Sequence, residues 1–131
     1  MRVMVLVKAT ENSERKGYTN TPEEKKSMEE MGRYNDELRN AGILITCDGL
    51  QPSSHGKRVA FDGPNRKVTD GPFAHPRELI AGFWIWEVKD MDEAVAWVKR
   101  CPNPHPEPCE IEIRPFYEIA DLQPTKGNGN D

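Results

Sequence analysis

Two segments of this sequence are apolar on both faces of a β-strand, and they constrain the fold more than any other feature. The first spans residues 2–8 and the second spans residues 80–88. Successive side chains of a strand point to opposite faces, so a strand that is apolar throughout must be covered on both sides. We therefore expect both segments to be central strands with packing partners above and below them.

A long amphipathic helix is predicted after the first of these strands. Thr21 and Glu24 are spaced for a capping box, and Pro22 suits the first helical position. Gly42 suits a left-handed cap at the end of the helix. The polar segment 9–20 before the helix is predicted to be a loop. The apolar residues recur at helical spacing, and the predicted core-facing stripe comprises Met28, Met31, Leu38 and Ala41.

A second helix is predicted after the aromatic strand. Asp90 is its N-cap, with Glu93 three residues later, and Cys101-Pro102 ends it. The following loop, residues 101–109, has proline at every second position, which favours an extended and stiff path. The predicted apolar stripe of this helix comprises Met91, Ala94, Val95 and Val98.

Two further strands and a hairpin complete the pattern. Residues 43–50 and 110–117 are predicted strands, and residues 57–61 and 66–69 form a hairpin that turns at residues 62–65. Without the hairpin the order is β-α-β-β-α-β, and two right-handed crossovers then give a ferredoxin-like α+β fold. We expect one antiparallel sheet with an inserted hairpin and with both helices on one face.

The uncovered face of this sheet predicts a homodimer. Two helices cover only one face, and an exposed apolar patch on a single chain usually marks an interface. A second copy that stacks sheet on sheet would cover the patch and leave a cleft between the two sheets. The chain of 131 residues fits a single domain over residues 1–122. Residues 123–131 are polar and rich in glycine and asparagine, so we expect a flexible tail.

Strand alternation predicts which side chains face this cleft. On the aromatic strand, Trp84 and Trp86 belong under the helices, so Phe83 and Glu87 face the cleft. The same argument places Glu112 and Arg114 of the last strand there, beside the apolar Met4, Leu6 and Ile85. Apolar walls with a few polar groups are typical of a small-ligand site, and Arg114 would hold an anionic group. The alternative is a structural ion pair between Arg114 and Glu112 or Glu87 at the rim of an interface.

Composition excludes several classes of partner. The 18 Lys and Arg residues against 22 Asp and Glu give a net charge of −4, and the isoelectric point is near 5.4. The aromatic strand resembles that of RNA-recognition domains, but an acidic chain without a basic face argues against direct nucleic-acid binding. No apolar run approaches the ~20 residues of a membrane span. Three cysteines without a Cys-x-x-Cys pair suggest reduced thiols and a cytoplasmic protein.

Asp70 and His75 are the candidate catalytic residues. Gly71 and Pro72 restrict the backbone after Asp70, and a rigid turn aims a carboxylate well. Asp70 would move a proton, and His75 lies just across the turn as a possible general base. The structural alternative is that Asp70 caps its own turn and that His75 is an exposed loop histidine.

The Cys101-x3-His105-x3-Cys109 spacing has donor atoms at regular intervals, as a zinc site would require. It offers only three ligands, and the alternating prolines stretch the loop instead of folding it round an ion. We therefore predict no metal and no cofactor.

Several motifs follow one another in a fixed order along the chain. They are Gly42, Gly49-Leu50-Gln51-Pro52, Thr69-Asp70-Gly71-Pro72-Phe73-Ala74, Gly82-Phe83-Trp84, Arg100-Cys101-Pro102-Asn103-Pro104 and Glu112-Ile113-Arg114-Pro115. With these motifs the chain resembles the YCII-related family, in its branch defined by a DGPF motif, from about Arg2 to Leu122.

The resemblance implies a dimeric α+β barrel. Branch members are small bacterial proteins, and some resemble accessory partners of extracytoplasmic-function sigma factors. A few members of the wider superfamily are enzymes that act on small cyclic or chlorinated compounds, with a histidine from the first long helix paired with an aspartate. This chain carries Tyr34 and Asn35 on that helix, and His75 stands where the branch usually has an acidic residue.

Two functional hypotheses follow. The first is a dimer that binds a small, anionic molecule in the intersheet cleft through Arg114, Glu112, Phe73, Phe83 and Glu87, with lyase- or isomerase-type proton transfer by Asp70 and His75. The second is a non-catalytic interaction module that associates with a sigma factor.

Overall fold

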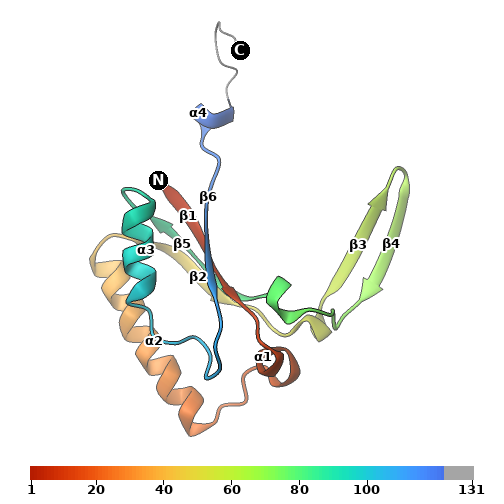
Figure 1. Ribbon diagram of the computed structural model, residues 1–131, viewed down its shortest axis with the longest axis horizontal. Helices are drawn as coiled ribbons and strands as arrows, with labels where there is room; N and C mark the ends of the chain where they lie inside the picture. Colours follow the sequence, from red (N-terminus) through yellow and green to blue (C-terminus); the bar gives the residue numbers. More distant parts are fainter. Residues whose placement is uncertain (123–131) are drawn as a thin grey trace, which may run out of the picture.

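The computed structural model describes residues 1–122, and the predicted tail at 123–131 lies outside them. Four antiparallel strands form one sheet in the order β2-β5-β1-β6, as the ferredoxin-like fold requires (Figure 1). The mixed α+β class and this strand order are confirmed. The strands are β1 (Arg2–Lys8), β2 (Leu44–Gly49), β5 (Ile80–Glu87) and β6 (Ile111–Pro115).

Two helices cover one face of this sheet, and the hairpin stands away from the other face (Figure 1). The helices are α2 (Pro22–Asn40) and α3 (Met91–Lys99). Thr21 and Glu24 form the predicted capping box of α2, and Gly42 has the expected positive φ of 75°. The core between sheet and helices contains Val3, Val5, Val7, Tyr34, Leu38, Ile43, Trp84, Trp86, Val88 and Ala94.

The predicted helical stripes are wrong at three positions. Met28 is 60% exposed, because only the second half of α2 lies against the sheet. Ala41 is exposed as the C-cap that follows the last helical turn. Tyr34 occupies the buried position instead. On α3, Val95 is exposed and Trp97 packs against the core in its place.

The segment predicted to be a loop, residues 9–20, contains a short helix, α1 (Glu11–Lys16). Thr10 and Ser13 cap it reciprocally. The Ser13 N–H donates to the Thr10 hydroxyl at 3.1 Å, and the Thr10 N–H donates to the Ser13 hydroxyl at 2.9 Å. Ser13 stands where a capping box usually has Glu or Gln, so the sequence motif did not predict that a helix begins at Glu11.

Strand alternation is confirmed for the central strands. Trp84 and Trp86 are buried under the helices, whereas Phe83 and Ile85 are only half-buried on the opposite face. We call this opposite side the open face. It is formed by Met4, Leu6, Lys8, Thr46, Asp48, Phe83, Ile85, Glu87, Glu112 and Arg114.

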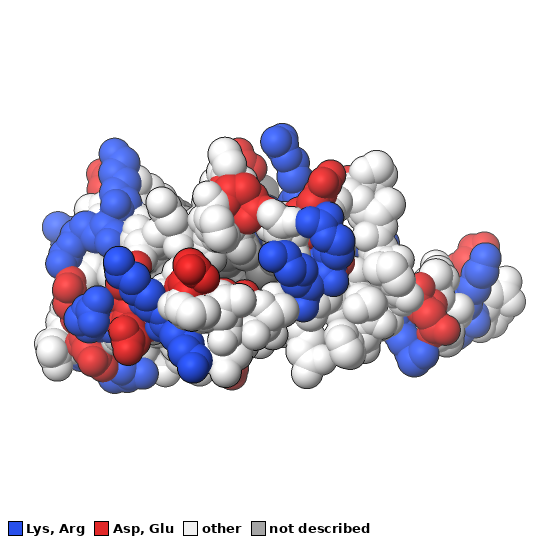
Figure 2. All heavy atoms as spheres, turned by 90° about the horizontal axis from the view of Figure 1, so that it is seen from below, with Lys and Arg blue, Asp and Glu red and all other residues white. Residues whose placement is uncertain are grey.

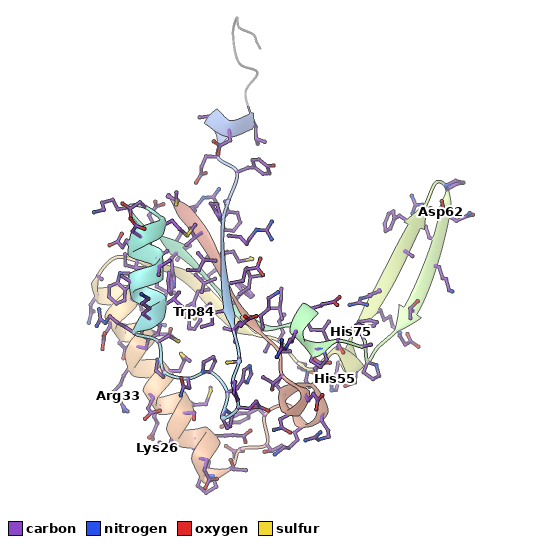
Figure 3. All side chains as sticks on the ribbon, in the orientation of Figure 1. Lys26, Arg33, His55, Asp62, His75 and Trp84 are labelled. Atoms are coloured by element: carbon purple, nitrogen blue, oxygen red, sulfur yellow. The ribbon has the colours of Figure 1, made fainter. Side chains whose placement is uncertain are left out.

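The hairpin forms a separate two-stranded sheet of β3 (Lys57–Asp62) and β4 (Asn65–Asp70). Every residue of both strands is exposed. Two single turns, η1 (Ser53–His55) and η2 (Pro76–Glu78), lie at its foot. Figure 3 shows Asp62 at the tip, and His55 and His75 in the segments at the foot.

After β6 the chain leaves the body of the molecule and ends, within the described residues, in α4 (Ile119–Leu122) (Figure 1). The last strand is shorter than the predicted 110–117 because the ladder with β1 stops at the Val3–Pro115 pair. Within residues 1–122, no helix has both the length and the hydropathy of a transmembrane segment.

Candidate functional site

Three charged side chains meet on the open face at the Lys8 end of the sheet. The β1–β6 register places Leu6 opposite Glu112 and Met4 opposite Arg114. Lys8 Nζ lies 3.1 Å from one carboxylate oxygen of Glu112, and Arg114 Nη1 lies 3.2 Å from the other. We call these residues the Lys8–Glu112–Arg114 cluster.

The cluster carries an excess of positive charge. The hydrogen bond from Lys8, followed by that from Arg114, lowers the pKa of Glu112, so its carboxylate stays ionised at neutral pH. One negative and two positive side chains leave a net charge of +1 within hydrogen-bond reach of one another. Arg114 is exposed, and within residues 1–122 only its Nη1 has a side-chain partner, so its other donors can reach a ligand.

Apolar side chains continue the open face beside this cluster. Leu6 is paired with Phe83, and Met4 with Ile85, across the β1–β5 ladder. All four are half-buried in one chain. The structure therefore brings Phe83, Glu112 and Arg114 to one face, as strand alternation predicts. An apolar row beside two cations suits a molecule with an apolar body and an anionic group.

Glu87 lies on the same face but at the other end of the sheet. It is opposite Arg2 in the register, and its carboxylate lies 2.6 Å from the amine of Met1. The ion pairs of Arg114 and Glu87 are therefore separate within the described residues, and only Glu112 is an ion-pair partner of Arg114.

Asp70 ends strand β4 and belongs to the hairpin. Its carboxylate lies 2.5 Å from Lys57 Nζ, and its side chain is 74% exposed. Within residues 1–122, no hydrogen bond or ion pair joins Asp70 to the Lys8–Glu112–Arg114 cluster. One chain alone does not bring the predicted proton-transfer group to the predicted anion site, and the catalytic role of Asp70 stays a prediction.

The turn after Asp70 packs tightly against the segment at η1. The Gly71 N–H donates to the Gly56 carbonyl at 3.0 Å, and the Phe73 N–H donates to the Ser53 hydroxyl at 3.0 Å. The Ser53 hydroxyl in turn donates to Glu14 of α1. The Gly71–Pro72 peptide is cis. This turn therefore holds the foot of the hairpin to the body of the molecule.

Phe73 takes part in the same packing. The Arg58 guanidinium lies 3.9 Å from the centre of the Phe73 ring, which is a cation–π contact between the foot of the hairpin and the turn. Phe73 therefore packs against Arg58 of the hairpin. Its role in substrate binding stays a prediction.

His75 follows this turn with a left-handed backbone, φ 62° and ψ 74°, and precedes η2. The chain then enters β5, whose first residue, Ile80, pairs with Lys8. The turn that contains Asp70 and His75 therefore leads to the end of the sheet that carries the cluster. Among the hydrogen bonds and ion pairs of the described residues, none joins His75 to Asp70, and its role as a base stays a prediction.

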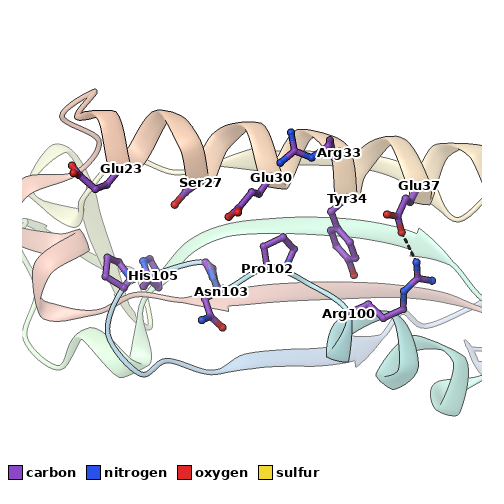
Figure 4. A pocket seen from close by; sticks show the side chains of 12 residues that line it. Glu23, Ser27, Glu30, Arg33, Tyr34, Glu37, Arg100, Pro102, Asn103 and His105 are labelled. Carbon is purple, nitrogen blue, oxygen red and sulfur yellow. Dashed lines mark hydrogen bonds and ion pairs between the residues drawn. The ribbon is translucent and has the colours of Figure 1, made fainter.

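A groove of about 680 Å³, which no sequence pattern predicted, lies between α2 and the loop after α3. Figure 4 shows Glu23, Glu30 and Glu37 along the helix side of this groove. Arg100 closes one end through an ion pair with Glu37. Its walls are α2 and residues 100–106, which lie far apart in the sequence. Neither segment alone therefore has a sequence pattern that predicts a groove.

The cysteines of residues 101–109 are partly buried thiols. Burial raises the pKa of Cys101 to about 12 and also raises the pKa of Cys109. His105 Nε2 instead contacts the backbone oxygen of Lys8 at 3.0 Å. Within residues 1–122, no three His, Cys, Asp or Glu side chains are grouped to hold a metal ion.

The comparison with known proteins fits this fold. Residues 1–117 match the family profile of the YCII-related domain. The chain belongs to the YCII-related family. One relative is an uncharacterised protein of Rhizobium meliloti (strain 1021), which is 26% identical over 102 residues, or 76% of this chain and 82% of the relative. That relative's name states no function.

In this YCII-related chain, the long helix α2 uses Tyr34 and Asn35 for packing. The buried Tyr34 hydroxyl donates to the Trp97 carbonyl at 2.5 Å. Asn35 Oδ1 accepts from the Trp84 indole N–H at 2.7 Å. Both side chains therefore join α2 to its neighbours on the covered side of the sheet, away from the open face.

Proposed function

We propose that two copies of this chain pack through their open faces and bind a small anionic molecule in the cleft between them. One observation carries this proposal: Lys8 and Arg114 share the single carboxylate of Glu112 beside a half-buried apolar row. The helices cover the opposite side of the sheet (Figure 1). We further propose that the chain belongs to the DGPF-motif branch, since Asp70-Gly71-Pro72-Phe73 forms the turn at the foot of the hairpin. The free thiols of Cys47, Cys101 and Cys109 support a cytoplasmic location.

The chemistry of the cluster favours an anion as the ligand. The apolar row would hold the body of the molecule, and Arg114 would bind a carboxylate or sulfonate with the donors that Glu112 leaves unused. A purely structural ion pair at this exposed position would contribute little to stability and nothing to binding. A measurement of anion affinity, and not of stability, therefore distinguishes an anion-binding site from a structural ion pair.

A fluorescent aromatic sulfonate, anilinonaphthalene sulfonate, has both features and serves as the probe. We expect Arg114→Gln to weaken its binding by about tenfold, which corresponds to one charge-assisted contact. Arg39→Gln is the matched control, because Arg39 is also exposed and pairs with one carboxylate, that of Asp36, but lies on α2. Equal affinities of the wild type and Arg114→Gln would exclude Arg114 as the anion-binding group.

Native mass spectrometry of the protein purified from its own cells tests the same proposal without a chosen probe. A small anion that remains bound to the wild type, and is lost from Arg114→Gln, supports it. The alternative, a non-catalytic module attached to a sigma factor, predicts a stoichiometric protein partner and no small molecule.

A further inference from the structure

The hairpin, residues 57–70, exposes an apolar surface that the other described residues, 1–56 and 71–122, leave uncovered. The register pairs Val59 with Val68 and Phe61 with Arg66, which puts these four side chains on one face. Val59, Val68 and Phe61 are 48%, 59% and 72% exposed. The Arg66 guanidinium lies 4.2 Å from the centre of the Phe61 ring, on the same face of the hairpin.

A two-stranded hairpin of this kind is marginally stable in water without a packing partner. Its six-residue strands pair only with each other, in a sheet of their own. Within residues 1–122, the Ser53 hydroxyl ties the foot to the body, because it accepts the Phe73 N–H at 3.0 Å and donates to Glu14 of α1. The foot is thus held in place, whereas the apolar side chains further out stay exposed among the residues that the structure describes.

The position of the hairpin indicates what lies beside it. α2 and α3 lie on one side of the sheet, and the hairpin projects on the side of the open face (Figure 1). Its strands of six residues are about 20 Å long, and two stacked sheets lie about 10 Å apart. The hairpin is therefore long enough to pass the sheet of a molecule that is stacked on the open face.

Charge also favours a second copy of this chain as the neighbour. The hairpin has four basic residues and two acidic ones, hence a charge of +2, so the rest of the chain, with a total of −4, carries −6. Figure 2 shows the hairpin standing apart from the body of the molecule, with charges of both signs on it. On the body, charged residues are densest over the helical side. A cationic arm against an anionic body is attracted to another copy of the same molecule.

We propose that each hairpin is a clasp that packs Val59, Phe61 and Val68 against the flank of a second copy. The inference rests on the face-to-face dimer of the proposed function and adds a second contact region to it. Because the hairpin forms no part of the four-stranded sheet, the apolar residues can be replaced without removing a core side chain.

The test compares the wild type with the double variant Phe61→Ser, Val68→Ser and with the control Met28→Ser. Met28 is similarly exposed but lies on α2, on the other side of the sheet. Sedimentation equilibrium gives the dimer dissociation constant, and hydrogen exchange followed by mass spectrometry gives the protection of residues 57–70. We expect the double variant to raise the dissociation constant at least about tenfold and Met28→Ser to leave it unchanged.

Hydrogen exchange identifies which proposal fails. The clasp would be overturned, and the open-face dimer left intact, by two results together. The wild type and the double variant would have the same dimer dissociation constant, and the hairpin amides would exchange as fast in the wild-type dimer as in the diluted monomer. A wild type that is monomeric at every concentration would overturn both. Slower exchange of the hairpin amides in the dimer, lost in the double variant, is the result that the clasp predicts.

Discussion

Gly71 lies so close to Ser53 that no side chain fits between them. A Cβ atom on Gly71 would stand 1.8 Å from the Ser53 carbonyl oxygen. Both partners are backbone, so neither can move away as a flexible side chain would. The contact explains why glycine follows Asp70 in this turn, and it fixes the foot of the hairpin against η1.

Gly71→Ala is expected to destabilise the fold by about 1–3 kcal/mol, the usual cost of forcing an extra carbon into a closely packed site. Urea unfolding measures the change. Gly56→Ala is the control, because its Cβ would lie 3.5 Å from the same Ser53 oxygen, an ordinary contact. Equal stability of Gly71→Ala and Gly56→Ala would show that the backbone of the turn can shift away from Ser53 at little cost in free energy.

Asn35→Ala is expected to lower the free energy of unfolding by about 1–3 kcal/mol, because it leaves the part-buried indole N–H of Trp84 without its acceptor. Asn40→Ala, at the exposed end of the same helix, controls for helix propensity. Thermal unfolding measures both. A loss in Asn35→Ala no larger than that in Asn40→Ala would mean that the bond contributes nothing.

Alkaline pH is expected to destabilise the protein through Cys101. Burial raises its pKa to about 12, so the folded state retains a proton that the unfolded chain loses near pH 8.5. This contribution is fully present below pH 8.5 and is lost as pH rises toward 12. The slope stays below about 1.4 kcal/mol per pH unit, because a single thiol changes the number of bound protons by at most one.

Cys101→Ser removes this titration while keeping a side chain of similar size. Urea unfolding at several pH values between 8 and 10.5 should therefore show a shallower loss of stability in the variant than in the wild type. Parallel curves for the two proteins would contradict the assignment. Tyr34, whose pKa burial also raises, contributes in the same direction at higher pH.

Glu112→Gln is expected to bind the sulfonate probe severalfold more tightly than the wild type at pH 7, because it releases two cations from a competing carboxylate. In the wild type the same gain should appear only as pH falls through the pKa of Glu112, which Lys8 and Arg114 hold below its usual range. Fluorescence titration measures the affinity. Weaker binding by Glu112→Gln would indicate that the carboxylate positions the cations instead of competing with a ligand.

Local patterns in the sequence were enough for much of the fold. Alternation along residues 80–88 placed Trp84 and Trp86 on the covered side, and Thr21 with Glu24 marked the start of α2. Each of these signals depends on residues that are neighbours in the chain. The same holds for Gly42, whose positive φ was expected from its place after the helix.

The features that the sequence analysis missed depend on contacts between distant segments. Strand alternation placed Glu112 on the face of the predicted cleft, but its ion pair with Lys8 depends on the register between β1 and β6 and on side-chain torsions. The contact of Gly71 with Ser53 joins residues on either side of the hairpin. The burial of Tyr34 in place of Met28 depends on where α2 crosses the sheet.

Sedimentation equilibrium of the wild-type chain at micromolar concentration tests the central proposal most directly. The half-buried row of Met4, Leu6, Phe83 and Ile85 predicts a species of twice the 14.9 kDa chain mass, and Ile85→Asp should reduce it to a folded single chain. A wild type that sediments as one 14.9 kDa chain at tens of micromolar would contradict the account, because the open face would then have no partner and no cleft.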